Sequence, residues 1–306
     1  MLPRAATALA LAVLAVAATA RAQTEAPSGV SSAPPATVPR EDSFETARSL
    51  ALGLGNRAST WGTGALAGNV ANMPLVPLYD LETTFTNVAG ERTFGAGGAI
   101  VDSRTAAVAA GVMTRGVFGN RGRDYSGLDL KAGMAMRLGS RLSAGIAGRY
   151  VRLGANDKSE GGQPIGPHAK GFTLDAAVRL TITEGFHVAV IGENLVDRHS
   201  PLVPQRVGGG IAYGWQRVVD IGFDLLTDLS TFDHATILLG TGLEVVALDK
   251  VPLRLGYRGD LGRDVHALTA GLGYSHQKIS LAFSIRQEFG SYGETILQLS
   301  FLGHVP

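Results

Sequence analysis

From position 78 to the C-terminus, apolar and polar residues alternate with a period of two, and this pattern constrains the fold more than any other feature. In segment 278–288, for example, Ile279, Leu281 and Phe283 fall on one face, whereas Ser280 and Ser284 fall on the other. Successive side chains of a β-strand point to opposite faces of its sheet. The segment is therefore predicted to be a strand with one apolar and one polar face.

The same alternation recurs along the chain and predicts fourteen strands. These are 78–88, 93–102, 105–118, 126–138, 141–154, 171–182, 186–195, 205–215, 218–228, 235–247, 251–259, 265–274, 278–288 and 294–304. Strands of globular proteins are most often about five or six residues long, whereas a tilted strand needs about 9–11 residues to cross a bilayer. Connections after even-numbered strands are short, and the longest connection, 155–170, follows an odd-numbered strand. Short turns at one end and longer loops at the other are typical of a membrane barrel.

The strands of a soluble β-sandwich also alternate apolar and polar residues, so this fold is the main alternative. Strand length and the order of short and long connections favour the barrel. Lipid offers no hydrogen bonds, and an open sheet edge would leave unpaired N–H and C=O groups. Only a closed sheet avoids that cost. We therefore predict an all-β fold, a 14-stranded antiparallel transmembrane β-barrel with a short N-terminal helical plug.

The N-terminal region differs from the rest in composition. Residues 1–22 combine a basic start, an uncharged apolar run and the small-x-small pattern Ala20-Arg21-Ala22, as a secretory signal peptide does. Residues 23–43 form a Pro/Ala/Ser-rich linker. Residues 44–77 are predicted to be the plug, with a helix capped by Asp42 or Ser43, and residues 78–306 the barrel. We expect cleavage near Ala22 and location in the outer membrane of a Gram-negative bacterium, in contact with its lipid.

Composition and motifs exclude several classes of function. The chain has 27 basic and 26 acidic residues and no cysteine, so it carries neither the basic excess of a nucleic-acid-binding protein nor a thiolate site. Its seven histidines lack metal-ligand spacing. Ser275 and His276 are adjacent, but no G-x-S-x-G nucleophile motif surrounds them. We therefore expect no enzyme, no catalytic residue, no metal and no cofactor.

The inward face of the predicted barrel carries charges of both signs. The candidates to line the lumen are Asp129, Lys131, Arg137, Arg149, Asp175, Arg179, Asp220, Asp224, Glu244, Arg254, Arg258, Arg286 and Glu288. They could pair with each other and hold the barrel round, or they could form a polar constriction that selects solutes. Small inward residues such as Gly133, Gly145, Gly222, Gly240 and Gly242 leave room for the plug or a ligand.

The chain resembles the FadL-like outer-membrane proteins, a group that includes the PorV-type barrels of bacterial secretion systems. The segment Ala65-Leu66-Ala67-Gly68-Asn69-Val70-Ala71-Asn72-Met73 lies where that group has a plug signature containing Asn-Pro-Ala-Gly, and Asn69 and Ala71 match it. The segments Ala47-Arg48-Ser49-Leu50-Ala51-Leu52-Gly53 and Leu253-Arg254-Leu255-Gly256-Tyr257 resemble its plug start and a late strand.

The resemblance implies a 14-stranded barrel with an N-terminal plug and two functions. The first is a passive conduit for a small hydrophobic compound. The second is a PorV-like partner barrel that holds or presents an exported protein at the outer membrane. An outer-membrane enzyme is a third and weaker hypothesis, because no nucleophile–base pair is visible in the sequence.

Overall fold

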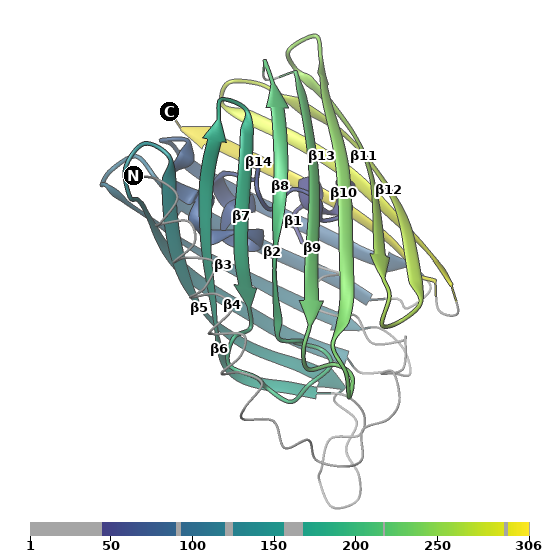
Figure 1. Ribbon diagram of the computed structural model, residues 1–306. Helices are drawn as coiled ribbons and strands as arrows, with labels where there is room; N and C mark the ends of the chain where they lie inside the picture. The colour runs from purple at the N-terminus through teal and green to yellow at the C-terminus, as the bar shows by residue number, and fades with distance from the viewer. Residues whose placement is uncertain are drawn as a thin grey trace, which may run out of the picture. The chain divides into compact units, whose positions relative to one another are not determined.

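The chain folds into a closed barrel with short helices inside it (Figure 1). The structure, a computed structural model, describes residues 45–89, 93–119, 125–155, 168–216, 218–290 and 293–305. The predicted signal peptide and linker lie outside these residues, so their boundaries stay predictions, as does the cleavage site near Ala22.

The barrel contains fourteen antiparallel strands, each hydrogen-bonded to its neighbours in sequence, and β1 closes the ring against β14. The strands are β1 (Tyr79–Ala89), β2 (Thr93–Asp102), β3 (Val108–Gly119), β4 (Tyr125–Arg137), β5 (Leu142–Ala155), β6 (His168–Thr183), β7 (Phe186–Glu193), β8 (Arg206–Trp215), β9 (Val219–Asp228), β10 (Thr236–Ala247), β11 (Val251–Asp260), β12 (Val265–Ser275), β13 (Ile279–Gly290) and β14 (Thr295–Val305). The prediction of a 14-stranded barrel is confirmed, and the soluble sandwich is excluded because the sheet closes on itself.

The two ends of the barrel differ, and we name them by their connections. At the turn end, even-numbered strands connect to the next strand through short segments such as 184–185 and 276–278. At the loop end, odd-numbered strands connect through segments that include 156–167 and 194–205. Of the longest predicted connection, 155–170, residues 156–167 lie outside the described residues.

Two of the strand boundaries that differ from the prediction have clear local causes. β3 begins at Val108, not at 105, because the Asp102 carboxylate accepts hydrogen bonds from the backbone N–H groups of Arg104 and Thr105 and forms a turn there. β7 ends at Glu193, not at 195, because Asn194 has a left-handed φ of 53°. Its N–H donates to the Asp175 carboxylate instead of continuing the strand.

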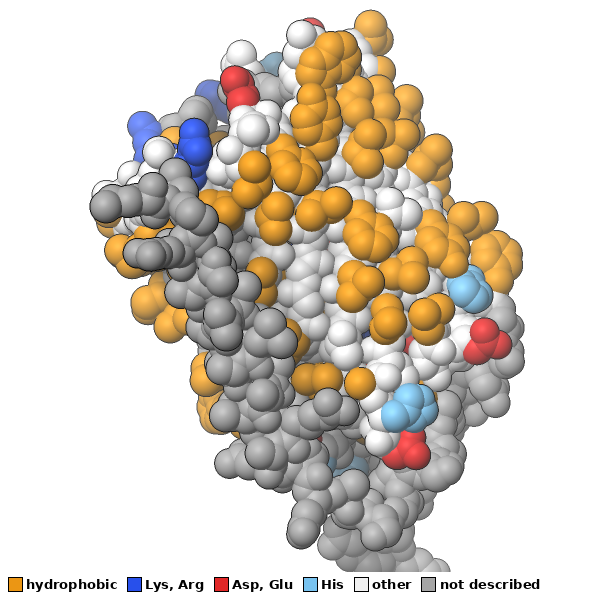
Figure 2. Space-filling view, in the orientation of Figure 1, with side chains coloured by type: hydrophobic (Ala, Val, Ile, Leu, Met, Phe, Trp, Pro, Cys, Tyr) orange, Lys and Arg blue, Asp and Glu red, His pale blue; other side chains and the backbone are white. Residues whose placement is uncertain are grey.

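The outer surface of the barrel is apolar, and the alternation in β13 shows how the sequence produces it. Phe283 is 46% exposed on the outside, whereas the next residue, Ser284, is fully buried on the inside. Figure 2 shows apolar side chains spread over the outer face of the strands, with most of the charged and histidine side chains in view near its ends. Because apolar side chains such as Phe283 are exposed on the outer face, this face suits contact with lipid.

In the described part of the chain before the barrel, three short helices form the plug, which we define as residues 45–77. They are α2 (Ala47–Ala51), α3 (Gly62–Gly68) and the 3-10 helix η2 (Val70–Leu75). The N-cap of α2 is Thr46, whose hydroxyl accepts from the N–H of Ser49, so the predicted cap at Asp42 or Ser43 is wrong. Within the described residues, no helix is both long and apolar enough to cross a membrane.

Candidate functional site

The lumen is filled by the plug, which makes a different kind of contact with each side of the wall. Towards β2–β8 the contact is apolar. Leu66, Val70 and Met73 of the plug are buried against small wall residues such as Ala135 and Ala177. Short alanine side chains on the wall leave room for the larger plug side chains, so this side is closely packed.

Towards β9–β11 the plug meets the wall backbone to backbone, at glycines. A Cβ atom on Gly222 of β9 would lie 1.9 Å from the carbonyl oxygen of Gly55, and one on Gly240 of β10 would lie 2.4 Å from that of Gly53. Gly53 itself has a positive φ of 59°. We call these contacts the glycine seat. The expectation that inward glycines make room for the plug is confirmed there, and also at Gly133 and Gly145, whose added Cβ atoms would meet Val70.

Arg48 anchors helix α2 to the wall through two of the predicted lumen charges. Its Nη2 lies 2.8 Å from Oδ2 of Asp220 and 3.0 Å from Oε1 of Glu244, and Arg254 contacts the same Glu244 from β11 at 2.5 Å. Burial lowers the pKa of Arg48, but the two carboxylates more than offset it and hold that pKa above its ordinary value. The guanidinium therefore stays charged, and the anchor is a permanent ion pair.

Arg57 is the second anchor and is almost fully buried, with 3% exposure. Its Nη2 lies 2.8 Å from Oε1 of Glu193 on β7, and its backbone N–H donates to Oδ2 of Asp224 on β9 at 2.9 Å. Burial lowers the pKa of Arg57, and nearby carboxylates, Glu193 first, raise it above its ordinary value. One plug residue thus connects two strands that are not neighbours.

The plug signature has a structural role around the same arginine. Asn69 caps η2 by accepting from the N–H of Ala71 at 3.1 Å. Its amide group also donates to the carbonyl oxygen of Arg57 at 2.7 Å, and Asn72 donates to that oxygen at 2.9 Å. Ala71 is fully buried against Gly145 of β5, where no larger side chain fits.

On the β4–β7 side, predicted lumen charges pair in the half of the barrel nearer the loop end, and we call this set the charge cluster. Arg149 binds Asp129 through two nitrogens, both at 2.8 Å, and Lys131 lies 2.6 Å from Asp175. Arg149 also donates to the side chain of Asn194, the first residue of the connection 194–205. The cluster therefore holds the start of that connection inside the barrel.

The remaining predicted residues also face inward or lie at the rim. Lys131, Arg137 and Arg179 donate to plug carbonyl oxygens, those of Ala67, of Pro74 and Leu75, and of Ala58. Of these three, Arg137 is exposed at the turn end. Three more, Arg258, Arg286 and Glu288, are buried on β11 and β13, and Arg286 lies 3.2 Å from Glu288.

The structure adds site residues that the sequence analysis omitted. They are Glu45, Arg48 and Arg57 of the plug, and Asp80, Glu82, Arg115, Glu193 and Arg206 of the wall. The wall residues follow the inward alternation of their strands or begin or end a strand, so that pattern could have found them. The plug residues lie outside the strands and so have no such periodic signal, and their partners lie far along the chain.

Beyond the charge cluster, at the loop end, the lumen becomes apolar. Leu202 and Val203 of the connection 194–205 fold inward and are buried against Val117, Val151 and Leu153 of β3 and β5. Val117 and Val151 each lie two residues nearer the loop end than the charges Arg115 and Arg149 of their strands. We call this cluster the apolar mouth.

A hydrogen-bonded row crosses the seam between β14 and β1 near the turn end. The hydroxyl of Ser280 lies 3.1 Å from Nε2 of His304, and Nδ1 of His304 lies 2.7 Å from Oδ1 of Asp80. Oδ2 of Asp80 accepts from the backbone N–H of Thr63 in the plug. Serine hydrolases use the same order of groups, but Ser280 lies inside a strand paired on both sides, where backbone amides are not available as an oxyanion hole. The row of hydrogen bonds therefore connects the plug to the seam between β14 and β1.

Within the described residues, no group of three potential ligands could hold a metal ion.

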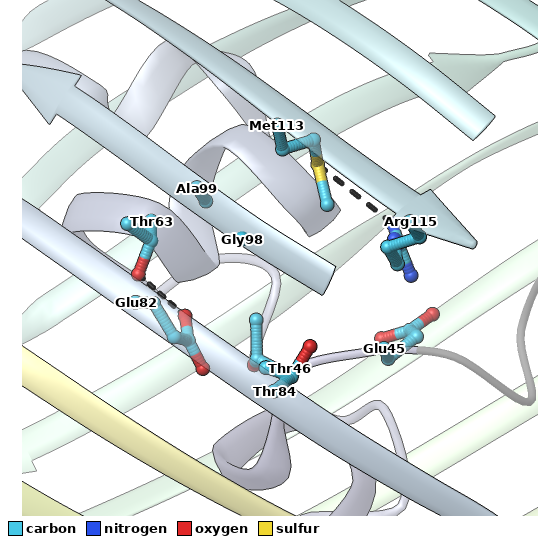
Figure 3. A pocket seen from close by; sticks show the side chains of 9 residues that line it. All are labelled: Glu45, Thr46, Thr63, Glu82, Thr84, Gly98, Ala99, Met113 and Arg115. Atoms are coloured by element: carbon cyan, nitrogen blue, oxygen red, sulfur yellow. Dashed lines mark hydrogen bonds between the residues drawn. The ribbon is translucent and has the colours of Figure 1, made fainter. Parts of the chain in front are cut away.

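Three small cavities lie between the plug and the wall, and neighbouring cavities share lining residues. The cavity nearest the loop end has a volume of about 30 Å³ and lies in the charge cluster. The middle cavity, shown in Figure 3, has a volume of about 10 Å³ and lies between the plug and β1–β3. The largest, about 90 Å³, reaches Ser275 and His304 at the turn end. An apolar cavity of about 150 Å³ can hold benzene in another protein, so none of the three holds an aromatic ring without movement.

Solved structures of other barrels share the fold of this chain. The chain overlays on the CymD monoaromatic hydrocarbon channel with a TM-score of 0.63 and 12% identity, over 85% of this chain and 97% of that one. The fold is FadL-like. The Ralstonia pickettii toluene transporter TbuX gives a TM-score of 0.61 and 12% identity, covering 86% and 98% of the two chains. A Pseudomonas aeruginosa FadL homologue gives a TM-score of 0.55 and 10% identity, over 87% of this chain and 98% of that one.

At these identities the likeness concerns the fold. No protein-family model matches the chain, and no curated protein matches it. CymD is described as a channel and TbuX as a transporter. The FadL-like part of the sequence resemblance is thus confirmed at the level of architecture, whereas the PorV-type part stays a prediction.

Proposed function

We propose that this protein is a passive conduit for small hydrophobic compounds across the outer membrane, with its loop end outside the cell. The observation that carries the proposal is the apolar mouth above a plugged lumen. The buried residues Leu202 and Val203 belong to a packed apolar cluster, into which a hydrophobic compound could pass from water when these side chains move. The hydrocarbon channels with the same fold support this choice of solute.

The lumen below the mouth suits passage without chemistry. Its charges are paired with each other or with the plug, as in Arg149 with Asp129 and Arg57 with Glu193. A neutral solute need not break these pairs, whereas an ion would have to compete with them. The plug closes the lumen at rest, so passage requires local movement of side chains or plug, driven by the concentration gradient.

The proposal is tested by uptake of radiolabelled toluene in a Gram-negative host without a hydrocarbon channel of its own. Cells that carry the protein in the outer membrane should take up toluene faster than cells with an empty vector. A charge in the mouth, Val203→Asp, should abolish the gain, because Val203 is fully buried in the apolar cluster.

The matched control is Val196→Asp, the same change in the same connection at a residue that is 42% exposed. It should leave uptake unchanged. Heat-modifiable gel mobility shows that each variant is folded in the outer membrane. Uptake that equals the empty vector for the unmodified protein would refute the proposed solute class.

A further inference from the structure

The three cavities of the lumen form a chain, because neighbouring cavities share lining residues. Glu45 and Arg115 line both the cavity in the charge cluster and the middle cavity. Thr63 and Glu82 line both the middle cavity and the cavity at the turn end. The chain extends from the charge cluster, where the wall residues of the cavity come from β3–β8, to the turn end, where they come from β1 and β11–β14. Between these two ends it passes the plug at the middle cavity, on β1–β3.

The other sides of the plug are closed by contacts of two kinds. On β9 and β10, the glycine seat puts wall and plug backbones in direct contact, and none of the three cavities includes a residue of these strands. On β4–β6, nearer the turn end than the charge cluster, Leu66 and Val70 fill the space against Gly133 and Ala177. A solute that passed on either side would have to separate close-packed surfaces, whereas the chain of cavities already holds partial space.

The middle cavity is the narrowest point of the chain. With about 10 Å³ it has room for about one water molecule. Figure 3 shows what closes it: the Thr63 hydroxyl donates to Oε2 of Glu82 at 2.6 Å, and Nη2 of Arg115 contacts the sulfur of Met113 at 3.7 Å. Both contacts are between side chains, so rotamer changes can open the gap without unfolding a strand or the plug.

We infer that the passage past the plug runs along β1–β3, and that Glu82, Thr63, Met113 and Arg115 form its gate. The inference rests on the proposed function for the nature of the solute. The path itself is a property of the packing. The gate consists of a hydroxyl, a carboxyl group, a guanidinium and a flexible thioether, and moving these side chains opens a gap of side-chain size, so it passes single small rings and excludes long or branched compounds.

The absence of cysteine from the chain allows single introduced cysteines to test the path. Ala99→Cys and Thr84→Cys each place a thiol in the middle cavity. The matched control is Ala177→Cys, an inward alanine of β6 that is buried against the plug and lines none of the three cavities. Each variant is treated in outer-membrane vesicles with a small benzyl methanethiosulfonate reagent, and the modified fraction is read by mass spectrometry.

The expected result is modification of Ala99→Cys and Thr84→Cys together with loss of toluene uptake, while Ala177→Cys is unmodified and keeps its uptake. Modification at 99 and 84 without loss of uptake, or no modification at either position, overturns the path. Modification of Ala177→Cys with loss of uptake places the passage on the other side and also overturns it.

The labelling readout separates this inference from the proposed function. If the unmodified protein carries no toluene but the thiols at 99 and 84 react and the thiol at 177 does not, the path is supported and the solute class is wrong. If toluene is carried and its uptake is insensitive to labelled thiols at 99 and 84, the solute class stands and the path is wrong.

Discussion

Substituting Gly222 by alanine should loosen the plug, and the structure gives the size of the effect. The added Cβ would lie 1.9 Å from the carbonyl oxygen of Gly55, whereas ordinary contact begins at 3.4 Å. Plug and strand must therefore separate by about 1.5 Å. Arg57 follows Gly55 by two residues, so the same shift strains its 2.9 Å hydrogen bond to Asp224.

Overpacking by one methyl group in a close-packed site costs about 1–3 kcal/mol. At about 2 kcal/mol, the population of molecules with a displaced plug rises by about 30-fold. An open lumen conducts water and small solutes, so the variant should leak. The assay is efflux of a small sugar from liposomes that contain the folded protein, with single-channel conductance as a second measurement.

The control is Gly148→Ala on β5, where an added Cβ has nothing within 4 Å. It makes the same change in chain entropy without a contact to the plug, so it should leave efflux as it is. Equal efflux from the two variants, with equal resistance to heat, would show that the plug does not rest on β9.

Three further predictions use other parts of the molecule. Arg57→Ala leaves Glu193 as a buried carboxylate without its main partner and should lower the free energy of unfolding by about 3–5 kcal/mol, whereas the exposed Arg152→Ala should change it by less than about 0.5 kcal/mol; urea titration measures both. Phe283→Arg, near the middle of β13, should make the free energy of folding in the membrane less favourable by about 2–4 kcal/mol, whereas Phe289→Arg, at the loop end of the same face, should cost about 0–1 kcal/mol. Heat-modifiable gel mobility measures the folded yield of each variant, and equal yields would contradict the membrane placement. Asn69→Ala removes the cap of η2 and should cost about 1 kcal/mol in thermal unfolding; an unchanged midpoint would show that the cap is dispensable.

The barrel was predictable because a period of two is a strong local signal. Each strand has an apolar outer row, and the strand ends follow from short polar connections. The errors arose where a side chain competed with the ladder, as when the Asp102 carboxylate bound backbone N–H groups and delayed β3.

The plug was harder to predict. Its position inside the barrel could be inferred, since a short apolar segment needs a surface to bury against and the inner wall carries small residues. The helix cap was misplaced by a few residues, as Thr46 is the N-cap. The ion pairs of Arg48 with Glu244 and of Arg57 with Glu193 join residues more than 100 positions apart, and no local pattern encodes them.

The seam between β1 and β14 constrains how the molecule is assembled. The strands that close the ring are the first and the last, so the sheet stays open until the C-terminal strand has been made. The plug immediately precedes β1 and is connected to the seam through Thr63, Asp80 and His304. In the closed barrel, Leu202 and Val203 of the connection 194–205 are buried at the loop end, and Arg137 donates to the plug at the turn end. Closure of the ring and docking of the plug are therefore coupled, because residues at the seam between β14 and β1 also hold the plug.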